Sequence, residues 1–314
     1  MQLIRPDINI DFLGKRKIAL TLSAVVLLIS LSLIMFKGLN LGIDFTGGTL
    51  VEVKFHQQTN IADIRSSITP AGYGKAVIQE FGYPEEILIR VQNQEGVEAS
   101  TISTAILDAL SDTFGADQVE MRRVEFVGPQ VGEELKASGM WAVIYTLGGI
   151  LLYVMFRFKL RFALGAVAAL FHDIIIVVGV FSLLQLEFSL SVVAALLTVL
   201  GYSLNDTIVV FDRIRENFAE NKKTKKPRDE VEVCNASINQ TLSRTLMTSI
   251  TTLLVVFSLY FFGGEVIHNF AFALLVGIAV GTYSSIFIAS PIMLSLEGKF
   301  EMSEEELKEL EERP

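Results

Sequence analysis

Six long apolar runs dominate this sequence and limit the folds that it can adopt. Each run is long enough to cross about 30 Å of hydrocarbon as a helix of roughly 20 residues. With 51% hydrophobic residues, 19% charged residues and a mean hydropathy of +0.49, the chain is more apolar than a soluble protein of its length. We therefore expect an integral membrane protein built as a bundle of six transmembrane helices. The runs cover residues 18–36, 138–156, 162–184, 188–211, 245–262 and 269–294.

The distribution of basic residues predicts how the helices cross the membrane. Lys and Arg cluster in residues 1–17, in the short loop after the second run, and in residues 212–244, a basic loop that leads to the start of the fifth helix. By the positive-inside rule these segments face the cytoplasm. Both termini, including the acidic tail 295–314, then lie in the cytoplasm, and residues 38–137 lie outside. The first run, 18–36, is followed by no small-residue cleavage site, so we interpret it as a retained anchor rather than a signal peptide.

The outer segment changes its hydrophobic period, which predicts a separate α+β domain. Apolar and charged residues alternate in "TLVEVKF", as in a strand with one buried face, and "AVIQEFG", "EILIRVQ" and "QVEMRRVEFV" are interpreted as three further strands. Two helical patterns lie between them, one capped by Asn60 and one in "STISTAILDALSDTF". We expect "YPE" to form the turn between the second and third strands. The order β-α-β-β-α-β predicts a ferredoxin-like split sandwich of about 80 residues.

Glycine-rich motifs connect this domain to the membrane helices. "LNLGIDFTGGTL" precedes it and contains Asp44, Gly47 and Gly48, and "EFVGPQVG" follows it and contains Gly128 and Pro129. Glycine permits positive φ angles and tight turns, so these motifs are either plain connections or hinges. The domain shows no catalytic grouping, which favours a binding or lever role.

Polar side chains inside the apolar runs carry most of the functional information. Asp206 lies in the fourth run, next to Asn205. Thr198 and Tyr202 precede Asp206 at intervals of four residues, which predicts one polar stripe on a helix. A carboxylate near the centre of a membrane helix costs about 2.5 to 3.5 kcal/mol on insertion scales, and such groups usually face a bundle interior or a water-filled path. We expect Asp206 to belong to an ion pathway; the open alternative is a structural carboxylate.

A second polar stripe in the fifth run supplies a candidate basic partner. If the two stripes face each other, Arg244 can neutralise the charge of Asp206. Because Arg244 lies near the start of the run, it could instead extend to lipid headgroups. The stripe follows steps of four and three and consists of Ser237, Thr241, Arg244, Thr248 and Thr251.

His172 and Asp173 place two ionisable groups about ten residues deep in the third run. Adjacent residues on a helix do not face each other, so we expect these two side chains to contact different neighbours, in either a structural network or a relay. Asp173 and Asp206 could in principle form an aspartyl dyad for proteolysis. Their different depths in the membrane disfavour that reading.

Small residues in the sixth run predict where two helices approach closely. Gly277 and Gly281 belong to a series of small residues that recurs every four positions, which is typical of tight packing between membrane helices.

Signatures of common enzymes are absent from the sequence. It contains no G-x-x-x-x-G-K-[ST] motif for nucleotide phosphates and no H-E-x-x-H motif for zinc. We therefore expect a protein that is not an enzyme and that has no cofactor and no metal site.

Five motifs closely resemble the SecF family of bacterial Sec protein-export subunits. They are "LGIDFTGG", "EFVGPQVG", "HDIII", "GYSLNDTIVVFDRIREN" and "TLSRTLMTS", and the similarity covers roughly Leu41 to Pro291. The resemblance implies membership of the resistance-nodulation-division superfamily and a place in the bacterial inner membrane, with the outer domain in the periplasm. It also implies pairing with SecD, which gives a unit of twelve spans.

The resemblance further implies a function and a set of partners. With the SecYEG channel, the SecA motor and the accessory proteins YajC and YidC, such a unit uses the proton motive force or a sodium gradient to complete the passage of unfolded secreted polypeptides. The transported ion is H⁺ or Na⁺, the surroundings are membrane lipid, and no nucleic acid is involved. The family's ion-pathway carboxylate falls on Asp206 and its basic partner on Arg244. Two alternatives stay open, namely half of a lipid or drug exporter and a passive translocon scaffold.

Overall fold

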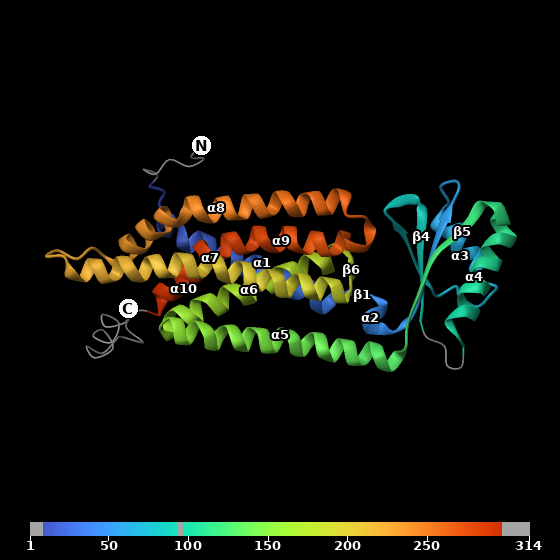
Figure 1. Ribbon diagram of the computed structural model, residues 1–314, viewed down its shortest axis with the longest axis horizontal. Helices are drawn as coiled ribbons and strands as arrows, with labels where there is room; N and C mark the ends of the chain where they lie inside the picture. Colours follow the sequence, from blue (N-terminus) through green and yellow to red (C-terminus); the bar gives the residue numbers. More distant parts are fainter. Residues whose placement is uncertain (1–8, 93–96, 297–314) are drawn as a thin grey trace.

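The computed structural model describes residues 9–92 and 97–296 of the 314-residue chain. Most of the predicted acidic tail and the first eight residues lie outside the described residues. The molecule is elongated, with a bundle of long helices at one end and a small α+β domain at the other (Figure 1).

Six segments among the described residues are long and apolar enough to cross a membrane. The first five are essentially single helices, and the sixth is made of several short pieces in series. They are η1 (Leu13–Lys15) with α1 (Arg16–Phe36), α5 (Pro129–Arg157), α6 (Leu160–Leu184), α7 (Leu190–Lys223), α8 (Glu230–Phe262), and finally η3 (Glu265–Ile267), α9 (His268–Ser284), η4 (Ser285–Ala289) and α10 (Ser290–Ser295).

The six segments are buried to very different degrees within the chain. The apolar stretch is 44% buried in α6, 50% in α7 and 61% in the last segment, but only 17% in each of α1, α5 and α8. Because hydrophobic side chains on a membrane helix can face lipid as well as protein, low burial does not destabilise the outer helices. The central three segments therefore form the core of the bundle, and the other three offer their faces to lipid or to a partner.

Helices α7 and α8 extend beyond the predicted spans. The sequence predicts mainly a loop for residues 212–244, whereas α7 continues to Lys223 and α8 already begins at Glu230. The extension is stable because Ile214 of α7 and Val233 of α8 are both buried in the same hydrophobic cluster as the membrane core. The apolar pattern of two packed helices thus continues past the end of the hydrophobic run.

The last segment is interrupted by a π-helical turn. The sequence predicts one span over 269–294, but the π turn Ser285–Ala289 separates α9 from α10. Pro291, the second residue of α10, has no N–H to donate to the preceding turn, which disturbs the regular hydrogen-bond ladder. Ser290 Oγ donates to the carbonyl of Ser285 at 3.2 Å. Such single π turns are frequent at functional sites.

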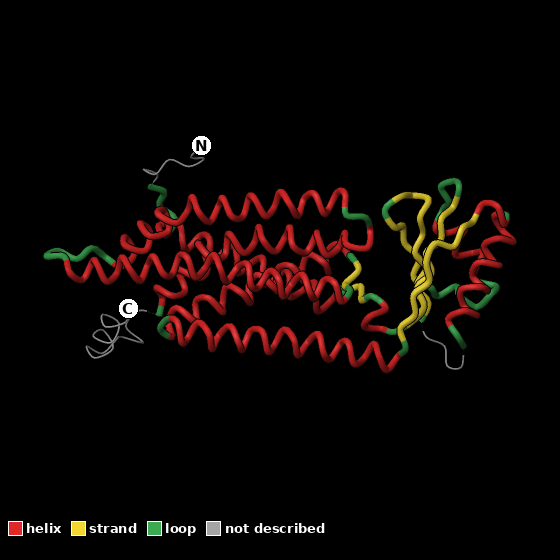
Figure 2. The backbone as a smooth tube through the Cα atoms, viewed as in Figure 1, coloured by secondary structure: helices red, strands yellow, loops and turns green. Residues whose placement is uncertain are grey.

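The outer domain consists of one antiparallel sheet with two helices on one face. Its sheet has the strand order β3-β4-β2-β5, and α3 and α4 cover the face that points away from the bundle (Figure 2). Alternating residues of β2 such as Val51 and Val53 pack against Ile64 of α3 and Ile106 of α4. The elements are β2 (Gly48–Phe55), α3 (Ile61–Ile68), β3 (Val77–Phe81), β4 (Tyr83–Val91), α4 (Ala99–Phe114), η2 (Ala116–Gln118) and β5 (Val119–Val127).

The turn between β3 and β4 lies one position earlier than predicted. The chain reverses at Gly82, which has a φ of 77°, and Tyr83 already pairs with Phe81. Pro84 was expected in the turn but is part of β4. It is tolerated because the pairing of β4 with β2 begins only at Glu86, so the missing N–H of the proline is not needed there.

Candidate functional site

A buried polar cluster centred on Asp173 of α6 lies in the core of the bundle. Ser203 Oγ of α7 donates to Asp173 Oδ2 at 2.6 Å, and Ser284 Oγ of α9 donates to the same oxygen at 2.8 Å. His172 Nδ1 lies 3.0 Å from Asp173 Oδ1. All four residues are buried. One carboxylate thus joins the three central helices.

The direct contact between His172 and Asp173 differs from the expectation that they would contact different neighbours. Nδ1 is the ring nitrogen nearest to the backbone, and it reaches one oxygen of the adjacent carboxylate while the other oxygen accepts from the serines. His172 Nε2 is buried and has no hydrogen-bond partner within the described residues. The imidazole stacks on Tyr283, whose hydroxyl contacts Ser23 of α1 at 3.0 Å.

Asp206 of α7 is also buried, at 2% exposed, but it is held less firmly. Ser249 Oγ of α8 lies 3.5 Å from Asp206 Oδ2, 2.9 Å from the carbonyl of Thr245 and 2.7 Å from Thr282 Oγ1. A serine hydroxyl has one proton to donate, so Asp206 and the carbonyl of Thr245 compete for it, whereas Thr282 can act as donor or acceptor. The contact of Asp206 with Ser249 is therefore weak, and the hydroxyl of Thr248 is a second group that acts on this carboxylate. An acid held by such exchangeable hydroxyl contacts suits a group that takes up and releases a cation.

The two acids belong to one polar layer across the bundle. Helix α7 contributes Ser203 to the first cluster and Asp206, one turn later, to the second. Helix α9 contributes Ser284 to the first cluster and Thr282 to the second. Asp173 and Asp206 nevertheless have different hydrogen-bond partners, so they are not the directly coupled carboxylate pair of an aspartyl protease.

The predicted polar stripe on α7 divides between the inside and the outside of the bundle. Asp206 points inward, whereas Thr198 and Asn205 are exposed. At 3.6 residues per turn, eight residues advance the helix by about 80° beyond two full turns, so Thr198 and Asp206 lie on different faces. Tyr202 is partly buried, and its hydroxyl has no hydrogen-bond partner among the described residues.

Arg244 lies on the exposed face of α8. It is close enough to act on Asp206 through space, but no direct ion pair joins the two side chains in the described part of the chain. Thr248, one turn further along α8, is partly buried and donates to the carbonyls of Arg244 and Thr245 at 3.1 Å and 2.9 Å. The pairing of Arg244 with Asp206 stays a prediction.

The two glycines expected at a packing seam lie against α7. An added Cβ at Gly281 would lie 2.9 Å from Ser203 Cβ and 3.5 Å from Asp173 Oδ2. An added Cβ at Gly277 would collide with the side chain of Val199. The close approach of α9 that these glycines permit is what brings its hydroxyl groups to the buried acids.

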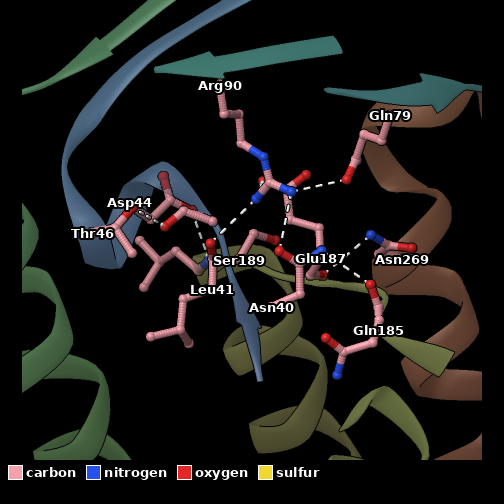
Figure 3. A network of polar contacts seen from close by, with 12 residues as sticks. Asn40, Leu41, Asp44, Thr46, Gln79, Arg90, Gln185, Glu187, Ser189 and Asn269 are labelled. Atoms are coloured by element: carbon pink, nitrogen blue, oxygen red, sulfur yellow. Dashed lines mark hydrogen bonds and ion pairs between the residues drawn. The ribbon is translucent and has the colours of Figure 1, made fainter. Parts of the chain in front are cut away.

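The glycine-rich motif before the outer domain contacts the outer end of the same helix. Short elements β1 (Asn40–Leu41) and α2 (Ile43–Thr46) precede the sheet. Asp44 Oδ2 of α2 accepts a hydrogen bond of 2.7 Å from the backbone N–H of Leu190, the first residue of α7 (Figure 3). Gly47 and Gly48 follow with φ angles of 65° and 136°, which a residue with a side chain rarely adopts.

The second motif forms the start of α5. Gly128 is its N-cap residue and Pro129 its first helical residue, where a proline ring is favourable because the N–H has no intrahelical acceptor. The hinge role of the motifs stays a prediction.

Several polar residues of this layer were missed by the sequence analysis. Ser203, Ser249, Thr282 and Ser284 are isolated hydroxyl residues within apolar runs, and their sequence positions do not indicate which helix face meets a carboxylate. Within residues 9–92 and 97–296, no group of three or more His, Cys, Asp or Glu side chains could hold a metal ion.

Comparison with known protein families agrees with this architecture. The family described as "Protein export membrane protein SecD/SecF, C-terminal" matches residues 106–299, and the "SecD/SecF GG Motif" matches residues 32–59, which include Asp44, Gly47 and Gly48. The chain belongs to the SecF family. The resemblance noted in the sequence is thereby confirmed, and this SecF-family chain is a multi-pass protein of the bacterial inner membrane and a Sec protein translocase subunit.

Relatives of the same family cover nearly the whole SecF-family chain. "Protein translocase subunit SecF" of Magnetococcus marinus is 52% identical over 95% of this chain and 95% of its own length. The subunit of the same name from Vibrio alginolyticus is 50% identical over 94% of this chain and 92% of its own length.

Two solved structures share the fold. The crystal structure of SecDF, a translocon-associated membrane protein from Thermus thermophilus, is 38% identical with a TM-score of 0.82 over 94% of this chain. The crystal structure of SecDF in a super-membrane-facing form is 37% identical with a TM-score of 0.69 over 100% of this chain. This chain spans only 40% and 41% of the length of those two SecDF chains.

Proposed function

We propose that this chain couples the movement of H⁺ or Na⁺ across the inner membrane to the late translocation of secreted polypeptides by the Sec machinery. The observation that carries the proposal is Asp206, a buried carboxylate whose hydroxyl contact, Ser249 at 3.5 Å, is shared with the carbonyl of Thr245 and with Thr282. An ionisable residue within a membrane segment is costly, and such residues typically mark ion pathways or proton relays. No catalytic role is proposed.

The energy of one ion limits the size of the conformational change. One elementary charge moved through the membrane potential yields about 2.3 kcal/mol per 100 mV. Converting a two-state equilibrium from 1:99 to 99:1 needs about 5.5 kcal/mol. One cation per cycle is therefore sufficient only when the two states of the bundle are nearly balanced.

In the proposed cycle, Asp206 interacts alternately with Arg244 and with the transported ion. When Asp206 binds a proton or cation, Arg244 is released, α7 to α9 repack, and the outer domain moves relative to the membrane. The exposed position of Arg244, and the absence of an ion pair between it and Asp206 among the described residues, support assigning the described conformation to the released state of that cycle.

The proposed assembly pairs this chain with SecD in a unit of twelve spans that works with SecYEG and SecA. The similarity to two SecDF chains more than twice as long supports the pairing. The low burial of α1, α5 and α8 also supports it, because these helices present broad apolar faces. The positive-inside pattern supports a topology with both termini in the cytoplasm and the outer domain in the periplasm. The strand order β3-β4-β2-β5 with two helices on one face supports a ferredoxin-like assignment for that domain.

Export into vesicles that contain the complete complex tests the proposal. In the wild type, an imposed ion gradient is expected to increase the amount of exported protein. Asp206→Asn is expected to abolish the increase but not assembly with SecD. Asp108→Asn is the matched control, because Asp108 is an exposed carboxylate of the outer domain. If Asp206→Asn responds to the gradient like the wild type, the chain is a passive scaffold instead.

Separate pH and sodium gradients identify the ion in the same vesicles. A response to the pH gradient alone assigns H⁺, and a response to the sodium gradient alone assigns Na⁺. A hydroxyl-lined carboxylate is chemically compatible with either ion.

A further inference from the structure

A single arginine of the outer domain reaches the outer end of the membrane bundle. Arg90 lies on β4, is only 7% exposed, and extends from the sheet toward the bundle (Figure 3). Its guanidinium donates to the carbonyl of Leu41 at 3.2 Å and to the side-chain oxygens of Asn40 and Gln79 at 3.1 Å and 2.8 Å. It also forms an ion pair of 3.4 Å with Glu187.

The anion in this contact lies in the connection between the two helices that carry the buried acids. Glu187 belongs to β6 (Glu187–Phe188), between the end of α6 at Leu184 and the start of α7 at Leu190. Strand β6 pairs in parallel with β1, so Asn40 lies opposite Glu187. A movement of the outer end of α7 relative to α6 must therefore displace Glu187 and the pair of short strands.

The same connection is tied to neighbouring helices. Asn269 Nδ2 of α9 donates to the carbonyl of Glu187 at 3.2 Å, and Asp44 accepts from the first N–H of α7. Three helices of the polar layer thus meet the outer domain at one place, where Arg90 of the sheet contacts Glu187 and strand β1.

The energetics suit a contact that forms and breaks. Removing two charges from water costs about as much as their attraction returns, so a buried ion pair fixes geometry more than it adds stability. Loss of one partner is different, because it leaves an uncompensated buried charge. This contact of Arg90 with Glu187, Asn40 and Leu41, called the junction below, therefore has a specific geometry but adds little stability.

We propose that Arg90 is a positioning residue that, through Glu187, transmits movement of the outer end of α7 to the outer domain. This inference rests on the proposed function, because it supplies the route by which ion binding at Asp206 reaches the periplasm. Arg90 touches no transported ion and acts only through the junction.

Distance measurements between two spin labels test the inference on the full chain in vesicles with its partner. One label is placed at Thr113 of α4 and the other at Val266 of η3, which are both exposed. The single native cysteine, Cys234, is buried. Wild type is expected to give a narrow distance distribution that shifts when the gradient is imposed.

Substitution of Arg90 is expected to change both the width of the distance distribution and its shift in response to the gradient. Arg90→Gln leaves the Glu187 carboxylate buried without its cation, so the distribution broadens and the gradient-driven shift is lost. The double variant Arg90→Gln/Glu187→Gln buries no unpaired charge and is expected to regain the narrow distribution and the shift. Arg122→Gln is the matched control, because Arg122 pairs with Glu120 on the exposed side of β5.

The possible outcomes separate this inference from the proposed function. If the wild type responds to the gradient and Arg90→Gln responds equally, the positioning role is overturned and the proposed function survives. If the double variant gives a distance distribution as broad as that of Arg90→Gln, the route through Glu187 is overturned. If neither export nor distance responds to the gradient in the wild type, the proposed function itself fails. Asp206→Asn is expected to keep the narrow distribution and lose only the shift.

Discussion

Asp173 Oδ2 accepts a hydrogen bond of 2.6 Å from Ser203 Oγ across the interface between α6 and α7. Both side chains are completely buried, and no water can replace either partner without a path into the bundle. The contact places Asp173 of α6 at the level of Ser203 of α7, which lies one turn before Asp206. Helix α7 therefore contacts one buried acid through Ser203 and carries the other, although no hydroxyl group of the described residues donates to both.

The first prediction concerns this contact. Ser203→Ala removes one of the donors to a buried carboxylate and should lower the free energy of unfolding by about 1 to 3 kcal/mol. Thermal unfolding of the purified complex in detergent measures the effect. Ser258→Ala, an exposed serine of α8, is the control and should change little. Equal unfolding temperatures for Ser203→Ala and wild type would show that the hydrogen bond does not contribute to stability.

The second prediction concerns the seam between α7 and α9. Gly277→Ala places a Cβ against the side chain of Val199, so the helices must separate, at a cost of about 1 to 3 kcal/mol. Val199→Ala in the same chain removes the obstructing atoms and should restore part of the stability. Gly148→Ala on α5 has no atom within 4 Å of the new Cβ and should be neutral. Failure of the second substitution to rescue the first would contradict this packing.

The third prediction concerns the cap that Asp44 provides to α7. Asp44→Ala removes the acceptor for the N–H of Leu190 and should destabilise the protein by about 0.5 to 2 kcal/mol. Asp44→Asn keeps an acceptor oxygen and should retain most of the stability. Hydrogen exchange of the amides at the start of α7 is the direct measurement, with faster exchange expected only for the alanine variant. Equally fast exchange in both variants would indicate that the charge of Asp44 matters more than the hydrogen bond.

The fourth prediction is a pH dependence at the junction. Burial raises the pKa of Glu187 above its ordinary value of 4.5, and Arg90 opposes this only in part. The charged groups around it are Arg90 of β4, Asp44 of α2, and Glu125 and Arg123 of β5. The folded protein binds the proton of Glu187 more tightly than the unfolded chain does, so protonation of Glu187 stabilises the fold. This stabilisation is fully present below pH 4.5 and is lost as the pH rises through the pKa of Glu187 in the folded protein.

Thermal unfolding of wild type and Glu187→Gln across this pH range checks the sign. The amide mimics the protonated acid, so wild type should approach the variant at low pH and become less stable than it as the pH rises. If the difference in unfolding temperature between wild type and Glu187→Gln stays constant with pH, Glu187 does not titrate in the folded protein.

Local patterns in the sequence were sufficient for much of the fold. The apolar runs, each long enough to span a membrane, identified six crossings, because length and hydropathy are properties of a contiguous segment. The alternation in β2 and the helical spacing in α4 likewise report burial of one face. The motif around Asp206 was specific enough to indicate the SecF family, which the family comparison confirms.

Properties that depend on two helices at once could not be predicted in this way. A step of four residues suggested that Thr198 and Asp206 share a face, but the bundle divides them because the helix turns by 3.6 residues. The contact of His172 with Asp173 depends on side-chain torsions rather than on helical spacing. Arg90 lies in a strand far from Glu187 in sequence, and nothing in either segment indicates that they meet.

Helix α7 has 34 residues and no interruption, so it forms a rod of about 50 Å. Its outer tip is capped by Asp44, Asp206 lies close to its midpoint, and its inner tip projects beyond the hydrophobic run. A tilt of about 5° around that midpoint would carry the two tips in opposite directions by roughly 2 Å each. A change of charge at Asp206, close to this pivot, would therefore move both ends of α7, on opposite sides of the bilayer, without bending the helix.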